Sequence, residues 1–407
     1  MKCRHCGAAL TLQFVDLGSA PPSNAYLTEN ALQAPEPWFP LRVLTCTHCW
    51  LVQTEDYAGA EQIFKDDYAY FSSYSSTWLD HAEKYVAAMV SRFHLSSTSR
   101  VVELAANDGY LLQFVAARGI RCLGVEPTAS TAASARAKGL EIIQEFFGVE
   151  LANSMLRQQL NADLVVANNV LAHVPDINDF LSGIAILLRK DGVATFEFPH
   201  LLNLVKHNQF DTIYHEHFSY LSLTAVCKIF ERNRLSVFDV EELSTHGGSL
   251  RVYAHRSDHD GTSSPSVDEI LECEQSAGLN RAEFYSGFQW RVDRAKNDFL
   301  CFLLEAKNSG KQVAAYGAAA KGNTLLNYAG VRRDLLAYVV DRNPAKQGKF
   351  LPGSRIPIVS EDHIRRERPD YVIILPWNIS PEVTHDLSYI RDWDGRFVTA
   401  IPQMQFQ

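Results

Sequence analysis

An alternation of apolar runs and helical stretches between about residue 99 and residue 255 constrains the fold of this chain more than any other feature. The apolar runs lie at residues 101–104, 122–125, 164–167 and 194–198, and the segments between them have helical composition. Strands that alternate with helices predict a parallel, doubly wound α/β sheet. We therefore expect a Rossmann-like domain in this region.

A second alternating set follows towards the C-terminus. After a polar, turn-rich stretch at residues 257–267 and a long helical region, apolar runs recur at 313–316, 336–340 and 371–375. The repeat of the pattern predicts a second, smaller Rossmann-like α/β domain.

The first 60 residues differ, because prolines and turn residues break any long helix and leave only short extended runs such as 41–44. A small, loop-rich module fits this composition. From about residue 61 to residue 93, apolar residues recur at helical spacing and indicate a lead-in helix. We expect three domains, at residues 1–60, 61–255 and 256–407.

The charge balance limits the partners. The chain has 407 residues, with 38 Lys and Arg against 47 Asp and Glu, and a net charge of -9. Such a chain is poorly suited to nucleic acid or to an acidic membrane surface. It has no apolar signal core and no stretch near the roughly 18 apolar residues of a membrane span. We expect a cytoplasmic monomer with no nucleic-acid or membrane partner.

Two Cys-x-x-Cys pairs predict a metal site in the N-terminal module. The four cysteines are Cys3, Cys6, Cys46 and Cys49. They supply the soft ligands of a tetrahedral zinc ion, which explains their paired spacing better than unrelated thiols do. Four thiolates leave no position for water or substrate, so the expected zinc is structural. His5 and His48 lie between the cysteines, and we expect them to be exposed.

The strand at 101–104 ends in a turn of small residues that lets the backbone approach a ligand closely. The next strand ends in Glu126, where a carboxylate can accept both ribose hydroxyls of an adenosine. The turn has no G-x-G-x-x-G motif, since Ala105 and Asp108 replace two glycines, and this favours S-adenosylmethionine over a pyrophosphate. A βαβ crossover without a ligand is the alternative. The expected cofactor residues here are Glu103, Ala105, Asn107, Gly109, Tyr110 and Glu126.

Polar residues also follow the strand at 164–167, at the sheet edge where open α/β folds bind ligands. We assign Asn168 to the cofactor, Asn169 to the substrate and His173 to catalysis. A cap on the following helix is the alternative role of His173.

Five motifs, in this order, carry a resemblance to a known family. They are the cysteine pairs, N-D-G-Y-L-L, N-N-V-L-A-H-V-P-D, Y-H-E-H-F-S-Y-L-S and G-G-S-L-R. With them the chain resembles, over its full length, the sugar C-methyltransferases that methylate nucleotide-linked 4-keto-6-deoxyhexoses. The resemblance implies a zinc-binding domain, an S-adenosylmethionine-binding domain and a C-terminal Rossmann-like domain that helps to hold the sugar nucleotide, linked to dTDP or GDP.

Methylation of a sugar carbon requires a base, because the carbon is acidic only beside a ketone. The base removes the C-3 proton while the 4-keto oxygen takes the charge. We choose His217, since an imidazole with a pKa near neutrality accepts a proton readily, and the resemblance implies the same role. It also implies active-site roles for Tyr214 and Glu216, which can orient the base, stabilise its imidazolium or hydrogen-bond the enolate oxygen. We assign His215 to the substrate.

The histidines of this segment do not form a catalytic zinc motif, because H-E-x-x-H places its histidines four residues apart and His215 and His217 are two apart. A polar loop before a helix that starts near Leu223 is the alternative interpretation.

The resemblance further implies an active-site tyrosine after the zinc module. Tyr68 matches it, and we assign the neighbouring Tyr70 to the substrate. Amphipathic packing is the alternative for any single tyrosine.

Two further segments suit a sugar nucleotide. Residues 247–251 offer backbone amides, the Ser249 hydroxyl and the Arg251 guanidinium, although a β-bulge with an exposed arginine is also consistent. Residues 316–324 predict a strand, a small-residue turn and a helix start, where the amides, Lys321 and Asn323 can meet a phosphate. A dinucleotide site with Asp341 is the competing interpretation, but the glycine spacing departs from that motif.

Three other functions stay open at this point. They are an O- or N-methyltransferase, a zinc-dependent scaffold or nucleic-acid-binding module, and an NAD-dependent enzyme acting through the C-terminal domain. The acidic net charge and the lack of a basic stripe disfavour the second.

Overall fold

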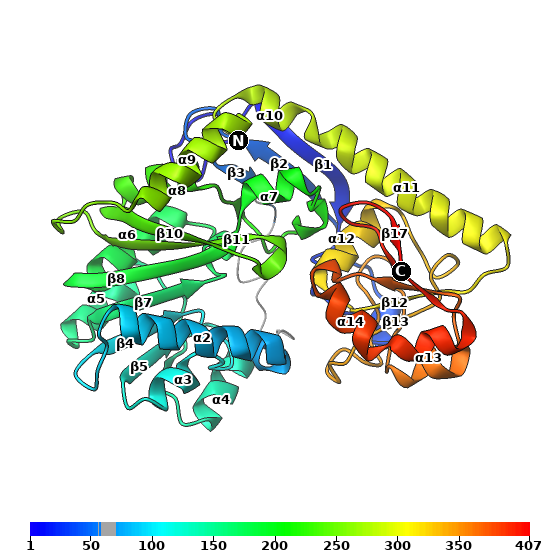
Figure 1. The fold of residues 1–407 in the computed structure, drawn as a ribbon, viewed down its shortest axis with the longest axis horizontal. Coiled ribbons are helices and arrows are strands. Elements are labelled where there is room, and N and C mark those ends of the chain that lie inside the picture. Colours follow the sequence, from blue (N-terminus) through cyan, green and yellow to red (C-terminus); the bar gives the residue numbers. More distant parts are fainter. Residues whose placement is uncertain (56, 58–70) are drawn as a thin grey trace.

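Three β-sheets organise the part of the protein that the structure describes (Figure 1). The computed structural model describes residues 1–55, 57 and 71–407. Tyr68 and Tyr70 therefore lie outside the described residues. Among the residues described, no helix is long and apolar enough to cross a membrane.

The largest sheet has seven strands in the order β10-β11-β8-β7-β4-β5-β6. The five strands from β6 to β8 pair in parallel, whereas β11 runs antiparallel to both of its neighbours. This confirms the parallel, doubly wound sheet, and the four expected runs are β4, β5, β7 and β8. The strands are β4 (Arg100–Leu104), β5 (Arg121–Val125), β6 (Ile142–Ile143), β7 (Ala162–Asn168), β8 (Leu188–Pro199), β10 (Leu235–Leu243) and β11 (Ser249–Arg256).

Helices cover both faces of this sheet, because its central strands are buried on both sides (Figure 1). Successive strand residues face opposite layers: Val101 packs in the layer of α2, and Val102 in the layer of α6. The first layer holds α2 (Ser76–Arg92), α3 (Leu112–Ala116) and α4 (Ala129–Ala137), and the second holds α5 (Val149–Arg157), α6 (Ile177–Leu187) and α8 (Leu223–Arg232).

Within the described residues of the expected lead-in, 71–93, the structure has one α-helix, and residues 61–70 lie outside the described part of the chain. α2 begins at Ser76, where the side chain of Ser75 accepts a hydrogen bond from the Trp78 amide and caps the helix.

The N-terminal module forms a separate four-stranded sheet, in the order β1-β2-β3-β9. Its first three strands are β1 (Leu12–Ala20), β2 (Phe39–Thr45) and β3 (Val52–Thr54). The fourth, β9 (Ser219–Tyr220), comes from the methyltransferase region and pairs antiparallel with β3. Backbone hydrogen bonds thus join the cysteine module to the segment that follows Tyr214.

A third sheet confirms the second α/β domain. Its order is β14-β13-β12-β15-β16-β17, with only β17 antiparallel. The run expected at 336–340 is shorter, because a turn at residues 332–336 precedes the strand. The strands are β12 (Val313–Tyr316), β13 (Val339–Val340), β14 (Ile358–Val359), β15 (Tyr371–Ile374), β16 (Arg396–Thr399) and β17 (Gln405–Phe406), with helices α12 (Ala320–Tyr328), α13 (Asp362–Glu367) and α14 (Ser380–Asp386).

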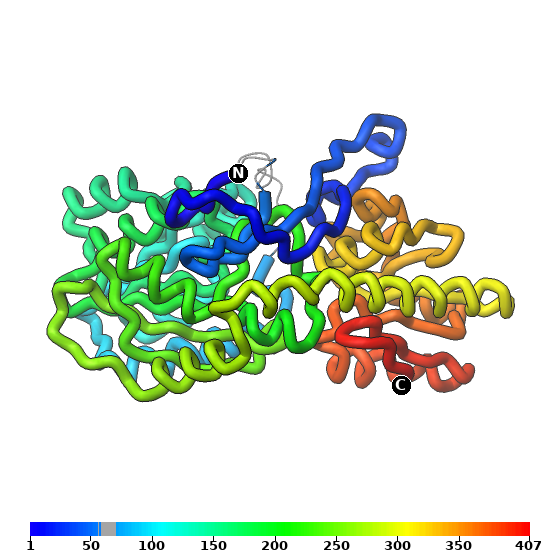
Figure 2. Tube along the Cα trace, turned by 90° about the horizontal axis from the view of Figure 1, so that it is seen from above, coloured from blue at the N-terminus to red at the C-terminus, as the bar shows by residue number. Residues whose placement is uncertain are grey.

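One hydrophobic core joins the module, the connecting helices and the C-terminal domain. Phe14 of β1 stacks on Phe288 of α11 with ring centroids 4.4 Å apart, and Leu325 of α12 belongs to the same core. α11 runs from beside β1 along the C-terminal domain (Figure 2). The connecting helices are α7 (Leu201–Lys206), α9 (Pro265–Ala277), α10 (Ala282–Ser286) and α11 (Phe288–Asn308).

Candidate active site

The four paired cysteines meet at one point of the N-terminal module. All four Sγ atoms lie within 4.8 Å of one another, with Cys3 and Cys49 3.6 Å apart and Cys6 and Cys46 3.5 Å apart. Sulfurs at about 2.3 Å from a tetrahedral zinc ion would lie about 3.8 Å apart, so the cluster fits the metal with little adjustment. The donor set and its geometry therefore suit a structural zinc ion.

The two histidines of this module differ in environment. His48 is exposed as expected, but the expectation for His5 was wrong. His5 is buried because its Nδ1 lies 2.9 Å from Asn178 Oδ1, at the start of α6. The first cysteine loop is thus docked on the methyltransferase domain.

The turn after β4 has the sharp geometry expected of a cofactor loop. Ala105, Asn107 and Gly109 all have left-handed backbone, with φ of 54°, 49° and 75°. A Cβ on Gly109 would lie 2.2 Å from Leu140 Cδ1, so only glycine fits between this turn and the residues after α4.

Two carboxyl groups flank this turn. Glu126 Oε2 accepts the Asn107 amide at 2.9 Å, and Oε1 accepts the Thr128 amide at 2.9 Å, which fixes the acid at the end of β5. Burial, with Glu126 and Asp108 nearby, raises the pKa of Glu103 well above its usual value. Tyr110 stacks on Trp78 of α2, with ring centroids 6.0 Å apart.

The end of β7 presents polar atoms without protein partners. Asn169 has a φ of 56°, and its amide donates to the Glu197 carbonyl at 2.7 Å. Asn168 Oδ1 and Asn169 Nδ2 are buried, and neither has a hydrogen-bond partner within the described part of the chain. Because buried polar groups are almost always paired, these two amides suit a bound ligand.

His217 and His173 come together beside the end of β7. The two imidazole centroids lie 4.6 Å apart. His217 Nδ1 lies 2.8 Å from the Thr212 carbonyl in η4 (Phe210–Thr212), and His173 Nδ1 lies 2.8 Å from the Glu216 carbonyl. A carbonyl can only accept, so each Nδ1 carries the proton and each Nε2 is the basic nitrogen.

The environment keeps these imidazoles neutral. Burial lowers the pKa of His173 to about 4. Burial, reinforced by His173 and by the positive charge of Lys321, lowers the pKa of His217 well below its usual value. Tyr214 Oη lies 2.9 Å from His217 Nε2 and donates to it. The arrangement is a neutral base with a phenol on its basic nitrogen.

The other residues of this segment contact the N-terminal module. Glu216 Oε1 accepts the backbone amide and the side-chain amide of Asn24, at 3.1 and 3.2 Å, and burial raises the pKa of this carboxyl. His215 is buried beside β2, with Nε2 3.2 Å from the Pro40 carbonyl. His215 therefore points into the module, away from the pair of histidines.

The C-terminal domain brings a lysine to the same region. Lys321 Nζ donates to Asn378 Oδ1 at 3.0 Å and lies 4.5 Å from the ring centroid of Trp377, in η6 (Trp377–Ile379). Burial lowers the pKa of Lys321 to about 8, partly offset by the charge of Asp211. Asp211 accepts the Trp377 indole N–H at 2.7 Å, and burial raises its pKa to about 6.

Two α12 residues anchor this helix to the N-terminal module and to the segment that holds Tyr214 and His217. Asn323 donates to the Ser23 carbonyl at 2.6 Å, and Thr324 donates to the Ile213 carbonyl at 2.7 Å. The helix that carries Lys321 is thereby bonded to the residue preceding Tyr214.

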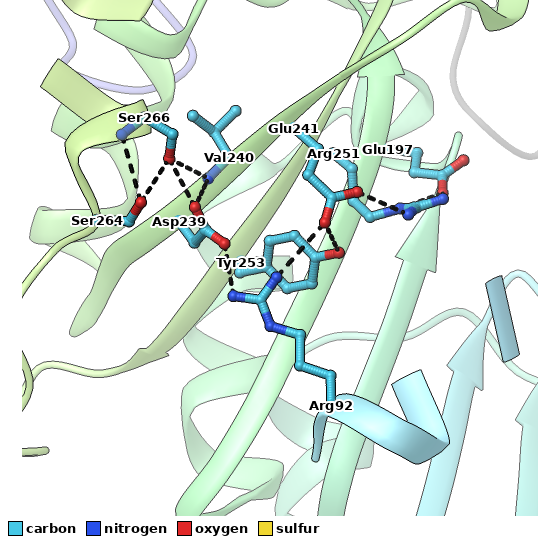
Figure 3. Close-up of polar contacts among 9 residues, drawn as sticks. All are labelled: Arg92, Glu197, Asp239, Val240, Glu241, Arg251, Tyr253, Ser264 and Ser266. Atoms are coloured by element: carbon cyan, nitrogen blue, oxygen red, sulfur yellow. Dashed lines mark hydrogen bonds and ion pairs between the residues drawn. The ribbon is translucent and has the colours of Figure 1, made fainter. Parts of the chain in front are cut away.

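Ser249 and Arg251 lie on β11 and have protein partners. Ser249 Oγ donates to the Thr245 carbonyl at 2.9 Å. Arg251 pairs with Glu197 at 2.6 Å and with Glu241 at 3.0 Å, inside a network that extends to Arg92 (Figure 3). Arg251 is buried among the strands of the sheet and is not exposed at the surface.

Several residues of this region carry no local sequence signal. They are Arg4, Asn24, Asp211, His246 and Trp377. His246 lies in η5 (Thr245–Gly247), with its ring centroid 5.1 Å from that of Trp78. Burial lowers its pKa to about 4. The pair Gly247-Gly248 is the sequence signal that could have indicated the turn between β10 and β11 that carries His246.

Fold, cofactor turn and cysteine cluster together define a zinc-containing, S-adenosylmethionine-dependent methyltransferase. Three family models match the chain in sequence order: "Putative zinc binding domain" over residues 3–64, "Methyltransferase domain" over residues 78–239 and "C-methyltransferase C-terminal domain" over residues 244–402.

The chain belongs to the C-methyltransferase family. It is 36% identical, over 402 residues, to the C-methyltransferase NovU of Streptomyces niveus, and the match covers 99% of this chain and 96% of that protein.

Two solved structures that resemble the chain cover about half of it. One is the magnesium protoporphyrin IX methyltransferase of Synechocystis PCC 6803, with 20% identity, a TM-score of 0.35, and coverage of 44% of this chain and 83% of that one. Another is the 1,6-didemethyltoxoflavin-N1-methyltransferase of Burkholderia thailandensis, with 15% identity, a TM-score of 0.37, and coverage of 51% and 96%.

Proposed function

We propose that this C-methyltransferase methylates C-3 of a nucleotide-linked 4-keto-6-deoxyhexose, carried on dTDP or GDP. The observation that carries the proposal is the hydrogen bonding of His217. Its Nδ1 is fixed on the Thr212 carbonyl, so Nε2 is the basic nitrogen, and in this structure it accepts the Tyr214 hydroxyl, whose place a substrate C–H would take. The family supports carbon as the acceptor atom, and a carbon acceptor needs a base of this kind.

The low pKa of His217 has two chemical consequences. The imidazole is deprotonated at neutral pH and ready to accept the C-3 proton. It is also a weak base, so proton removal depends on stabilising the enolate oxygen at the same time. The Tyr214 hydroxyl, a donor beside Nε2, and the Lys321 ammonium are the groups of this region that supply such stabilisation.

The residues around the turn after β4 hold the cofactor in this proposal. S-adenosylmethionine, when bound, supplies the methyl group. Glu126, at the end of β5, is the acid proposed to accept the ribose hydroxyls, Glu103 at the end of β4 is a second cofactor residue, and Asn168 offers an amide oxygen with no partner among the described residues.

Lys321 supports an anionic substrate. It is a desolvated cation, and no carboxylate oxygen of a described residue lies within ion-pair distance of it. A phosphate oxygen of the sugar nucleotide would provide the missing charge partner. Asn323 Oδ1, buried and with no partner in the ranges that the structure describes, lies on the same helix.

The turn after β12 does not support the NAD alternative. Asp341 accepts the Ala318 amide at 2.8 Å and pairs with Lys346 at 3.4 Å, while the Tyr26 hydroxyl donates to the Ala318 carbonyl at 2.6 Å. The acid that a dinucleotide site would use for the ribose is thus paired with a lysine of its own domain, and a tyrosine of the N-terminal module is bonded to the turn.

The experiment incubates the enzyme with S-adenosylmethionine and a panel of dTDP- and GDP-linked 4-keto-6-deoxysugars. Mass spectrometry locates the added methyl group, and NMR in D2O follows exchange of the C-3 proton. We expect a mass gain at C-3 and deuterium wash-in before methylation. Methyl transfer to oxygen or nitrogen without C-3 exchange would instead identify an O- or N-methyltransferase.

Two variants test the base, and one serves as a control. We expect His217→Ala and His217→Asn to bind S-adenosylmethionine normally but to slow C-3 exchange by about 10²- to 10⁴-fold. His207, an exposed histidine at the end of α7, gives the matched control His207→Ala. Near-normal exchange in both His217 variants would exclude His217 as the base.

A further inference from the structure

Arg4, in the first cysteine loop, links the metal module to both histidines of the active site. We propose that Arg4 is a positioning residue, which fixes His173 and His217 relative to one another. The proposal rests on the proposed catalytic role of these histidines, but its physical test does not depend on it.

The Arg4 guanidinium joins two chain segments that are far apart in sequence. Nη1 donates to the Pro175 carbonyl at 2.9 Å, and Nη2 donates to the Thr54 carbonyl at 3.1 Å. Pro175 lies two residues after His173. The guanidinium carbon also lies 5.3 Å from the ring centroid of Phe218, next to His217.

Thr54 connects this contact to the backbone of His217. The Thr54 hydroxyl donates to the His217 carbonyl at 3.2 Å, and the Thr54 amide donates to the Phe218 carbonyl at 3.1 Å. One end of the arginine fork therefore holds the strand that fixes His217, and the other end holds the loop that carries His173.

The two histidine segments also bond directly to each other. The Phe218 amide donates to the Ala172 carbonyl at 2.8 Å, beside the contact between His173 and the Glu216 carbonyl. The hydrogen bonds of Arg4 add a further link between the two segments, beside these two bonds.

The cysteine loop determines where Arg4 lies. The Arg4 amide donates to Gln53 Oε1 at 2.9 Å, and Gln53 Nε2 donates to Cys3 Sγ at 3.3 Å. On the opposite side, Asn178 Nδ2 donates to the Arg4 carbonyl at 3.2 Å and to the His5 carbonyl at 2.9 Å. A metal bound by the cysteines would fix this loop, so the structural ion is also a constraint on catalytic geometry.

Arginine suits this task better than lysine does. Its planar group offers several N–H donors in a fixed fork, which matches two carbonyls on different segments, whereas one ammonium has no such fixed geometry. We therefore expect Arg4→Lys to keep part of the effect and Arg4→Ala to lose it.

The matched control is Arg42→Ala. Arg42 belongs to the same module and forms two hydrogen bonds of 2.7 Å to Glu55, and among the described residues none of its hydrogen bonds reaches either histidine segment. A general effect of removing an arginine from this module would appear equally in both variants.

The experiment measures zinc content, hydrogen exchange of peptides covering residues 170–178 and 213–220, and steady-state methyl transfer. For Arg4→Ala we expect one zinc per chain, a KM for S-adenosylmethionine within twofold of wild type, and a kcat about 10- to 100-fold lower, since small misplacements of reacting groups cost this much. Amide exchange should accelerate in both peptides, with Arg4→Lys intermediate and Arg42→Ala unchanged.

Two results would overturn the inference. One is a kcat within twofold of wild type with unchanged exchange in both peptides. The other is loss of zinc from both Arg4→Ala and Arg4→Lys, which would show that Arg4 is needed to form the metal site and not to position the histidines. If His217→Ala keeps its activity, the proposed base is wrong, yet the exchange measurements still decide whether Arg4 fixes the two segments.

Discussion

Gly247 lies where the methyltransferase domain meets the C-terminal domain, and its replacement by alanine gives a quantitative test of that contact. Its φ is +87°, and a Cβ would lie 2.4 Å from Trp377 Cη2 and 2.7 Å from Gln209 Nε2. The left-handed backbone costs an alanine about 1–2 kcal/mol. Trp377 is held by Asp211 and cannot retreat freely, so the overlap adds about 1–3 kcal/mol. We expect Gly247→Ala to lose about 2–5 kcal/mol of unfolding free energy.

Gly139→Ala is the control that separates the cost of a left-handed backbone from the cost of steric overlap with the new Cβ. Gly139 has a φ of +82° and no atom within 4 Å of its would-be Cβ, so it should lose only the backbone cost of about 1–2 kcal/mol. Urea unfolding followed by tryptophan fluorescence measures both variants. Because Trp377 lies against Lys321, Gly247→Ala should also raise the KM for the sugar nucleotide at least tenfold and leave S-adenosylmethionine affinity within twofold. Equal destabilisation of the two variants would refute the contact at Trp377.

Two further predictions concern protons and the metal. The pKa of His246 is lowered to about 4, so its contribution to stability is present above pH 6.5 and is lost as the pH falls towards 4. Solvent access to His246 reduces this effect to about half of its full value. Between pH 7 and pH 5, the free energy of unfolding measured in urea should therefore fall by about 1 kcal/mol more for wild type than for His246→Asn. Equal losses in the two proteins would contradict this prediction. Removal of the metal by a chelator should abolish methyl transfer and accelerate amide exchange in β3 and β9, while calorimetry still detects S-adenosylmethionine binding, because the cofactor turn lies between β4 and α3. If the protein is shown to be free of zinc and still transfers methyl groups at the wild-type rate, the metal site is not required for activity and the prediction is wrong.

Much of the architecture could be predicted from local patterns. The strands β4, β5, β7 and β8 are buried on both faces and read as continuous apolar runs, which made them visible in the sequence. The cysteine cluster was equally visible, because the paired spacing is a local requirement of metal coordination. The cofactor turn has the backbone conformations that its small residues suggested.

The features that could not be predicted from the sequence depend on contacts between residues far apart in the chain. Asn24 bonds to Glu216 across 192 positions, and Trp377 bonds to Asp211 across 166. Nothing in the sequence around one residue of either pair indicates that the other residue will be its partner. The expectation of an exposed His5 failed for the same reason, since its burial depends on Asn178, 173 residues away.

The sheet that joins β1, β2, β3 and β9 also affects how the chain folds during synthesis. The four cysteines lie within the first 49 residues, so the metal site can form early. The aromatic face of β1 cannot be buried so early, because Phe14 packs against Phe288, which is made much later. At translation rates of about 5–20 residues per second, this partner follows roughly 15–55 seconds later. The apolar face of β1 stays uncovered until then, and the β3 edge stays open until β9 has been made, so we expect chaperones to bind this module during synthesis.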